Sequence, residues 1–263
     1  MEILLTNDDG IYAPGLAALQ KELAALGNVT LVAPAVEQSG VGHSITYLTP
    51  LIVNEVFDGV KRRGYAVEGS PADCVKLGLT EYCPRRPDLV VSGINYGLNA
   101  GINVLYSGTV AAAIEGAFFG LTSVAVSLEF RQHPEFDRAA TVARRVIERI
   151  LAQKGPAPQL YNVNIPTAAL WEKPQVKVAP MDVRQYAEHY EKRIDPRGRS
   201  YYWAAGRLPE DHDATETDLT ALADGFVTIT PLEFDLTKRS AVSAMQDWSF
   251  DGLDADAPGK RKD

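Results

Sequence analysis

The residues best suited to chemistry are two adjacent acids near the amino terminus, Asp8 and Asp9. They follow an apolar run, residues 2–6, that is typical of a buried strand. Two carboxylates about 4 Å apart repel by several kcal/mol at an effective dielectric constant of about 20. They therefore need a shared proton, a basic neighbour or a cation, and the next basic residue along the chain is Lys21. We interpret the pair as a site for a hard divalent cation with oxygen ligands; a solvated turn is the alternative.

The position of the pair favours the cation site over the turn. Neighbouring side chains on a strand point to opposite faces, so the two acids converge only if the chain leaves the strand between them. Gly10 supplies the backbone freedom for that change of direction. Open α/β sheets bind ligands just outside the carboxyl ends of their strands, where this pair is expected.

Three other places offer polar ligands. Residues 92–101 read SGINYGLNAG, and their asparagines, Asn95 and Asn99, could supply neutral oxygen ligands or form turns, which the composition favours. Ser107 and Thr109 precede a helix of small residues, where they form either an anion site or ordinary helix caps. Ser39 lies in a long Gly-rich loop and is weak as a candidate by itself.

Two familiar classes fit this pattern poorly. A haloacid-dehalogenase-type phosphatase needs a nucleophilic Asp where this chain has Asn7, and an amide cannot form an aspartyl phosphate. A signalling receiver domain needs a phospho-accepting Asp where this chain has Ser92 and Gly93. The remaining interpretation is metal-assisted hydrolysis of a phosphate ester.

The elements that must position these residues alternate between strand and helix, which predicts a doubly wound α/β sheet that is mostly parallel. Besides residues 2–6, the expected strands are residues 29–33, a hairpin within 45–67 around Asp58 and Gly59, and residues 88–92, 121–128 and 160–165. The expected helices are residues 15–27, 70–82, 110–120 and 134–153.

The character of the chain changes after Pro166. We expect a catalytic core over residues 1–170 and a carboxyl-terminal extension over 171–263 that is not an independent domain. Within the extension, residues 192–203 combine basic and aromatic side chains, which we interpret as a protruding hairpin that packs on a partner subunit. Strands at 176–179 and 227–232, an acidic loop at 206–218, a short helix or arm at 242–248 and a frayed tail at 251–263 complete it.

The composition narrows the possible partners. A net charge of −8 and a pI of about 5.1 argue against binding to duplex nucleic acid through its phosphate backbone. The sequence has neither a signal-peptide pattern nor a long apolar span, which predicts no membrane association and a cytoplasmic location. Cys74 and Cys83 are expected to be buried thiols, and the four scattered histidines argue against a zinc site.

Several motifs in combination resemble the SurE (survival protein E) family of metal-dependent phosphatases. The resemblance covers nearly the whole chain, through ILLTNDDGIYAPGL, the Ser39-Gly40 pair, VVSGINYGLNAG, YSGTVAAAIEG, DPRG…YYW and ITPL…DLT. It implies a Rossmann-like three-layer core with an extension that joins subunits into a homodimer or homotetramer. It also implies hydrolysis of nucleoside 5′-monophosphates, and leaves open whether 3′-monophosphates are hydrolysed as well.

The resemblance further implies site residues. One Mg²⁺ or Mn²⁺ per subunit would be held by Asp8, Asp9, Ser39 and Asn95, and the phosphate by Asn7, Ser107, Gly108 and Thr109. We expect a metal-activated water to attack phosphorus, with Asp8, Asp9 and Ser107 as the catalytic residues. A covalent Ser107 nucleophile and a nucleotide-binding regulatory protein without turnover are the alternatives.

Overall fold

The structure is a computed structural model that describes residues 1–184, 187–207 and 216–250. It divides into two compact units, residues 1–232 and 233–263. The expected tail at 251–263 and most of the expected acidic loop at 206–218 lie outside the described residues. In the described part of the chain, no helix has the length and apolar character needed to cross a bilayer.

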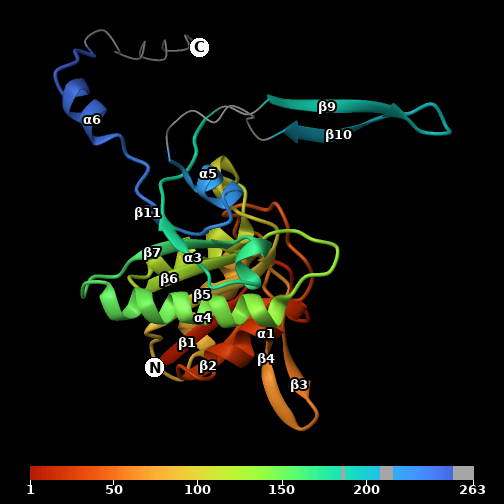
Figure 1. The fold of residues 1–263 in the computed structure, drawn as a ribbon, viewed down its shortest axis with the longest axis vertical. Coiled ribbons are helices and arrows are strands. Elements are labelled where there is room, and N and C mark those ends of the chain that lie inside the picture. The colour runs from red at the N-terminus through yellow and green to blue at the C-terminus, as the bar shows by residue number, and fades with distance from the viewer. Residues whose placement is uncertain (185–186, 208–215, 251–263) are drawn as a thin grey trace, which may run out of the picture. The chain divides into compact units, whose positions relative to one another are not determined.

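Nine strands of the first unit form one sheet in the order β3-β4-β2-β1-β5-β6-β7-β11-β8 (Figure 1). These strands are β1 (Glu2–Thr6), β2 (Asn28–Pro34), β3 (Val53–Asp58), β4 (Lys61–Val67), β5 (Leu89–Tyr96), β6 (Thr122–Leu128), β7 (Leu160–Ile165), β8 (Val176–Val178) and β11 (Val227–Leu232). Neighbours from β4 to β7 pair in parallel, whereas β3 is antiparallel to β4 and β11 is antiparallel to β7. The expected mostly parallel sheet is therefore confirmed.

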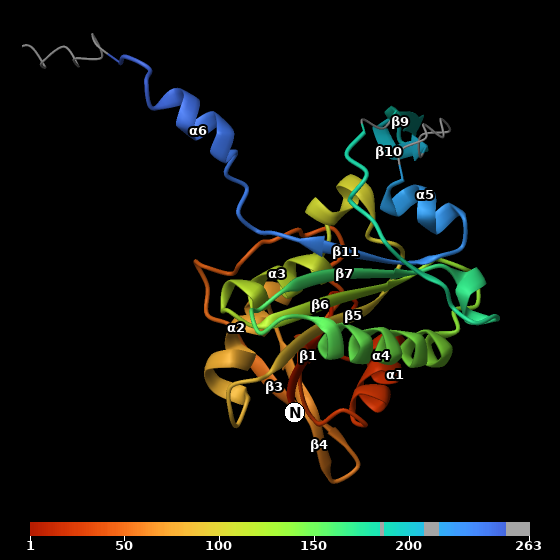
Figure 2. The same ribbon diagram turned by 60° about the vertical axis from the view of Figure 1, so that its left-hand side comes forward.

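Helices cover both faces of this sheet and make three layers (Figure 2). The helices of the first unit are α1 (Pro14–Leu23), α2 (Pro71–Leu77), α3 (Gly108–Phe118), α4 (Phe136–Gln153) and α5 (Asp218–Ala223). Ile3 and Leu5 of β1 belong to one core cluster with residues of α1 and α4, and Leu4 belongs to another with residues of α2 and α3. The alternation of side chains along β1 thus fills both core layers, each buried Leu stabilising the fold by about 1.5–3 kcal/mol.

The order of the strands defines where a ligand should bind. From the central strand β1, the chain adds β2 and β4 on one side and β5, β6 and β7 on the other. The direction of strand addition changes between β1 and β5, which pair in parallel from Ile3 with Leu89 to Thr6 with Ser92. In open α/β sheets the crevice outside the carboxyl ends of such a strand pair is the usual binding position.

Three elements differ from the expectation. α1 ends at Leu23, and Gly27 lies so close to the first residue that an added Cβ would come within 1.9 Å of the Met1 carbonyl oxygen. The helix expected to reach Tyr82 ends at Leu77, and Gly78–Tyr82 forms a π-helical turn. β5 continues past Ser92 to Tyr96, with an irregular register against β6 between Ser92 and Asn95.

Glycine explains the irregularity in β5. Gly93 has a φ of +143°, and a Cβ there would lie 2.4 Å from the carbonyl oxygen of Val126 in β6. The strand can therefore pass β6 at this point only without a side chain, and it carries Asn95 beyond the irregularity. As a result Asn95 lies on the last part of a strand, and not in the loop that the sequence predicted.

Two segments beyond residue 170 form structures of their own. The hairpin β9 (Ala187–Ile194) and β10 (Ser200–Arg207) is a separate two-stranded antiparallel sheet, as expected from its sequence. The second unit contains one described helix, α6 (Arg239–Met245). The remaining strands, β8 and β11, belong to the main sheet.

The two cysteines differ in burial. Cys74 is fully buried in α2 and Cys83 is partly buried, and both are free thiols. Burial raises the pKa of the Cys83 thiol to about 11, so it is protonated at neutral pH.

Candidate active site

The loop after β1 is closed by the side chain of Asn7. Its Nδ2 donates to the carbonyl oxygen of Gly10 (3.1 Å), and the Gly10 amide donates back to its Oδ1 (3.2 Å). Gly10 has a φ of +100°, a conformation that other residues rarely adopt. Asn7 is thus engaged in shaping the turn, and its expected contact with a phosphate stays a prediction.

Asp8 lies against the first residues of α3. It is 3% exposed and accepts a hydrogen bond from the hydroxyl of Thr109. The backbone amide of Thr109 also bonds to the carboxylate. An added Cβ on Gly108 would lie 2.9 Å from the Asp8 Cβ and 3.1 Å from its Oδ2, so the helix can come this close only because residue 108 is glycine. The structure therefore brings together three predicted site residues that are about 100 positions apart in the sequence.

Asp9 lies beside Asp8 and reaches the end of β5, where the backbone amide of Tyr96 donates to its carboxylate. Burial, followed by the charge of Asp8, raises the pKa of Asp9 to about 7 from its usual value near 4. Burial also raises the pKa of Asp8, against the lowering effect of the Thr109 hydrogen bonds. Among the residues that the structure describes, neither acid is paired with a basic side chain.

Glu37 adds a third negative charge that the sequence analysis did not single out. It contributes to raising the pKa of both Asp8 and Asp9, so its carboxylate lies within electrostatic range of them. Its Oε1 accepts a hydrogen bond from the Ser39 hydroxyl (2.7 Å). The loop that carries Ser39 is tied to the acidic loop by the Gln38 amide, which donates to the Asp8 carbonyl oxygen (2.7 Å).

The two asparagines after β5 have different roles. The Nδ2 of Asn95 donates to the carbonyl oxygen of Gly97 (2.7 Å), which leaves its Oδ1 as an acceptor. Asn99 is structural: its Nδ2 donates to the Ser127 hydroxyl (2.9 Å), and its carbonyl oxygen accepts from Asn162 (2.7 Å). Asn99 thus links the loop to β6 and β7 and does not form the expected turn, while Asn95 keeps an oxygen that could serve as a ligand.

These residues fit a divalent metal. Uncompensated negative charge at Asp8 and Asp9 favours a cation, and carboxylate, amide and hydroxyl oxygens are the ligands that Mg²⁺ and Mn²⁺ take. Within the described ranges no group of three or more His, Cys, Asp or Glu side chains could hold a metal. A metal held by the two acids would therefore take its other ligands from neutral oxygens, for which Asn95 and Ser39 remain the predicted candidates.

Ser107 begins α3 as its N-cap. Its Oγ accepts a hydrogen bond from the Val110 amide (3.1 Å), and its side chain is almost completely buried. The amino-terminal end of this 11-residue helix carries a partial positive charge, and two of its amides already bond to oxygens, that of Val110 to Ser107 and that of Thr109 to Asp8. This end of α3 therefore suits a phosphate group next to the acids.

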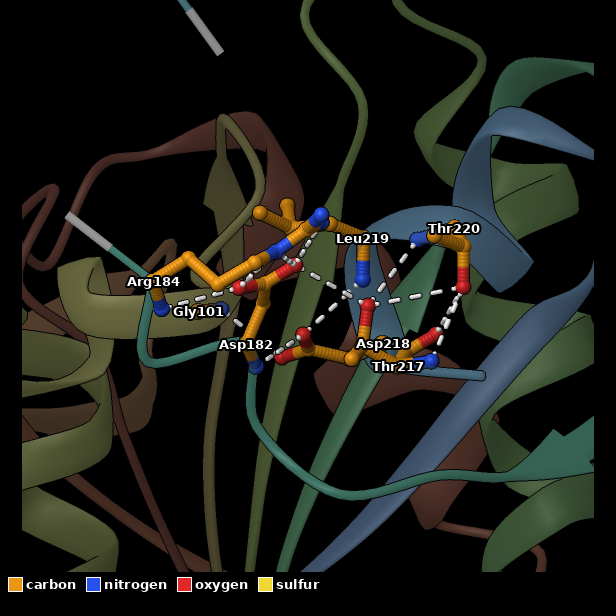
Figure 3. Close-up of polar contacts among 7 residues, drawn as sticks. All are labelled: Gly101, Asp182, Arg184, Thr217, Asp218, Leu219 and Thr220. Atoms are coloured by element: carbon orange, nitrogen blue, oxygen red, sulfur yellow. Dashed lines mark hydrogen bonds and ion pairs between the residues drawn. The ribbon is translucent and has the colours of Figure 1, made fainter. Parts of the chain in front are cut away.

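A buried polar cluster holds the segment that leads to Ser107 (Figure 3). Asp218, at the start of α5, accepts from the amides of Gly101 (2.7 Å) and Asp182 (2.8 Å). Asp182 in turn accepts from the Arg184 guanidinium (2.9 Å) and the Thr217 hydroxyl (3.1 Å). Gly101 begins a 3₁₀ helix, Gly101–Leu105, that ends two residues before Ser107.

The sequence analysis missed this cluster because its three segments, around Gly101, Asp182 and Asp218, are separated from one another by more than 30 residues. The available signal was Thr217 followed by Asp218 and, at the third helical position, Thr220, which form a capping box.

Comparison with known proteins decides the family. The family model of survival protein SurE matches residues 3–188. The chain belongs to the SurE family. A "5'-nucleotidase SurE" of Rhodopirellula baltica is 60% identical over 252 residues, covering 95% of this chain and 99% of that protein. A protein of the same name from Desulforudis audaxviator is 45% identical, covering 95% and 98%.

The solved structures agree with this assignment. The crystal structure of the SurE protein from Aquifex aeolicus superimposes with a TM-score of 0.82 at 39% sequence identity, covering 94% of this chain and 98% of that one. The resemblance stated from the motifs and the Rossmann-like three-layer fold are thereby confirmed.

Proposed function

We propose that this protein is a metal-dependent 5′-nucleotidase that hydrolyses nucleoside 5′-monophosphates, with 3′-monophosphates as additional candidate substrates. The observation that carries the proposal is the pair of uncompensated acids at the switch between β1 and β5, with Asp8 buried directly against the amino-terminal end of α3 and Asp9 half-buried beside it. The names of the SurE relatives support the reaction.

Each part of the site has a proposed role. Asp8, Asp9, Asn95 and Ser39 would hold one Mg²⁺ or Mn²⁺ per subunit. Such an ion polarises a phosphate ester and lowers the pKa of an attacking water. Asp8 and Asp9 would orient that water, and Ser107, Gly108 and Thr109 would hold the phosphoryl oxygens at the helix end.

The experiment is a substrate panel with metal control. Phosphate release from 5′- and 3′-monophosphates is measured with Mg²⁺ or Mn²⁺, after chelation, and after the metal is restored. We expect chelation to abolish release and metal to restore it. Asp8→Asn and Asp9→Asn should each lower turnover at least about 100-fold because each removes a charged ligand. Asp58→Asn, at an exposed hairpin position, is the matched control.

Two outcomes would contradict the proposal. Full activity of the metal-free enzyme would exclude the metal role. Nucleotide binding without phosphate release from any monophosphate, with metal present, would favour a regulatory nucleotide-binding protein. The homodimer or homotetramer, the oligomerising role of residues 171–263 and the cytoplasmic location remain predictions.

A further inference from the structure

The loop between β2 and β3 carries Ser39 and contacts both the loop of the proposed metal ligand Asp8 and the segment before the proposed phosphate-binding residue Ser107. On one side, the Gln38 amide donates to the carbonyl oxygen of Asp8 (2.7 Å). On the other side, the Gly42 amide donates to the carbonyl oxygen of Tyr106 (3.1 Å), the residue directly before Ser107. Gly40 and Gly42 have positive φ angles, and an added Cβ on Gly40 would meet no other atom within 4 Å. The segment around Ser39 is therefore held by few contacts of its own.

The first side chain after Ser39 that anchors the loop belongs to His43. Its Nε2 lies 2.7 Å from Oε2 of Glu115 in α3. Lys76 of α2 reaches the other oxygen of the same carboxylate, with Nζ 2.6 Å from Oε1. The Glu115 side chain is 5% exposed, whereas those of His43 and Lys76 are 39% and 38% exposed. A partly exposed imidazole and a partly exposed ammonium group thus converge on one buried acid.

Glu115 is a fixed negative charge at this position. Burial alone would raise its pKa, but the hydrogen bonds from His43 and Lys76 outweigh burial and lower the pKa below its usual value. A buried carboxylate that lost one of its partners would keep its desolvation penalty. The contact with His43 is therefore a strong attachment point for a loop that is otherwise largely exposed.

The same stretch of loop is attached again just after His43. The Ser70 hydroxyl donates to the carbonyl oxygen of Ser44 (2.7 Å), and the Thr46 amide donates to the carboxylate of Asp73 (3.1 Å). Both partners belong to the capping box of α2. Residues 43–46 are thus tied to α2 and α3, and His43 is the first residue after Ser39 whose side chain attaches the loop, following the backbone hydrogen bond of Gly42.

We propose that His43 is a positioning residue for the proposed metal site: by binding Glu115, it holds the loop segment that carries Ser39 between the Asp8 loop and the segment before Ser107. This inference rests on the proposed function. Glu115 lies about two helical turns beyond Gly108 along α3, so His43 is bound by a residue well inside the helix and not by its first turn. His43 therefore acts through Ser39, and not by contact with the substrate.

The test compares His43→Ala with His43→Gln, which keeps an Nε2 donor, and with His133→Ala, an exposed histidine in another loop. Binding of Mn²⁺ is measured by calorimetry, and kcat and KM are measured at saturating Mn²⁺. We expect His43→Ala to weaken Mn²⁺ binding about tenfold while kcat at saturating metal stays within about threefold. His43→Gln should recover most of the affinity, and His133→Ala should match the unmodified protein.

A second measurement does not depend on metal or activity. Tyr47 and Leu48 are 85% and 92% exposed in the same loop, so chymotrypsin can report its opening. We expect cleavage after Tyr47 to be at least about fivefold faster in His43→Ala than in the unmodified protein, with His43→Gln in between.

The outcomes separate this inference from the proposed function. If the unmodified protein releases no phosphate, the proposed function fails, while the Mn²⁺ affinities and cleavage rates still test His43. Unchanged Mn²⁺ affinity and cleavage in His43→Ala would overturn the positioning role. A loss of kcat above about 1,000-fold with unchanged Mn²⁺ affinity would overturn it too, because that result would place His43 in the chemistry itself.

Discussion

At the scale of single residues, Gly108 sets how closely α3 approaches Asp8. A methyl group at this position would lie within 3.1 Å of both the Cβ and Oδ2 of Asp8, so either the helix or the acid would have to move. Asp8 is also held by Thr109, the next residue of the helix. A small displacement here therefore changes the geometry of both the proposed metal site and the proposed phosphate site.

We expect Gly108→Ala to lower turnover at least about tenfold and to lower the free energy of unfolding by about 1–3 kcal/mol, the usual cost of overpacking. Initial rates and urea denaturation measure the two effects. Gly155→Ala is the matched control, because an added Cβ at Gly155 meets no atom within 4 Å. Normal rates in Gly108→Ala would show that the contact with Asp8 does not matter for the reaction.

Ser107 has a structural role as the N-cap of α3 and a proposed catalytic role. The expected loss of stability from removing its hydroxyl is small, whereas the expected loss of turnover is large. Removing an N-cap hydroxyl costs about 1 kcal/mol, which lowers Tm by about 2–4 °C in a protein of this length. Removing a preorganised donor to a transition state costs on the order of 10²–10³ in turnover. We therefore expect Ser107→Ala to lose far more activity than stability, as measured by kcat and thermal unfolding. An acid-stable phosphoserine at Ser107, trapped by rapid quenching, would instead establish covalent catalysis.

At the scale of elements, the cluster of Figure 3 joins α5 to the 3₁₀ helix before Ser107 through two buried acids with opposite pKa shifts. Hydrogen bonds from Arg184 lower the pKa of Asp182 to about 2. Burial raises the pKa of Asp218. Asp182 therefore stabilises the fold above its unfolded pKa of about 3.9, and this contribution is lost as the pH falls toward 2. The contribution of Asp218 has the opposite sign, because its raised pKa favours the protonated form.

We expect Asp182→Asn to lower the free energy of unfolding by about 1–2 kcal/mol at pH 7, after allowance for the partly exposed Arg184. The difference from the unmodified protein should shrink below about pH 3, where Asp182 itself becomes protonated. Urea denaturation at pH 7 and pH 2.5 measures both values. A difference that does not depend on pH would mean that the ion pair with Arg184 contributes nothing measurable.

The elements also show what the sequence could and could not predict. β1 was predictable because its apolar run and the Asp8–Asp9–Gly10 exit are local signals. The place of β11 in the sheet was not predictable. Its sequence VTITPL indicates a strand but contains no signal that this strand pairs antiparallel with β7. For the same reason local sequence patterns could not predict the contact of His43 with Glu115, which lies 72 residues away. Asn95 was found as a candidate through its motif, but its place on β5 depends on the close passage of Gly93 against β6.

At the scale of the whole molecule, the hairpin and the second unit expose large apolar side chains. Trp203 is 60% exposed on the hairpin, and Trp248 is 57% exposed in the second unit. Aromatic residues at this exposure are typical of surfaces that become covered on association. We accordingly keep the prediction that residues beyond about 170 build an oligomer.

We expect the intact protein to sediment as an oligomer at micromolar concentration and the double variant Tyr202→Ser, Trp203→Ser to sediment at half that mass or less. Phe57→Ser removes an aromatic side chain of similar exposure (54%) from β3 in the core and should leave the mass unchanged. A monomeric intact protein would refute the prediction.

The late position of β11 in the sequence has a consequence for synthesis of the chain. β11 lies between β7 and β8, and β8 pairs only with β11 in the described sheet. About 60 residues separate β7 from β11, so at about 5–20 residues per second the ribosome takes roughly 3–12 s to supply β11 after β7 has been made. During this interval β7 has an open edge that can pair with the β7 of another nascent chain. The risk of aggregation is therefore greatest on the polysome, and a translational pause just before Val227 would increase it.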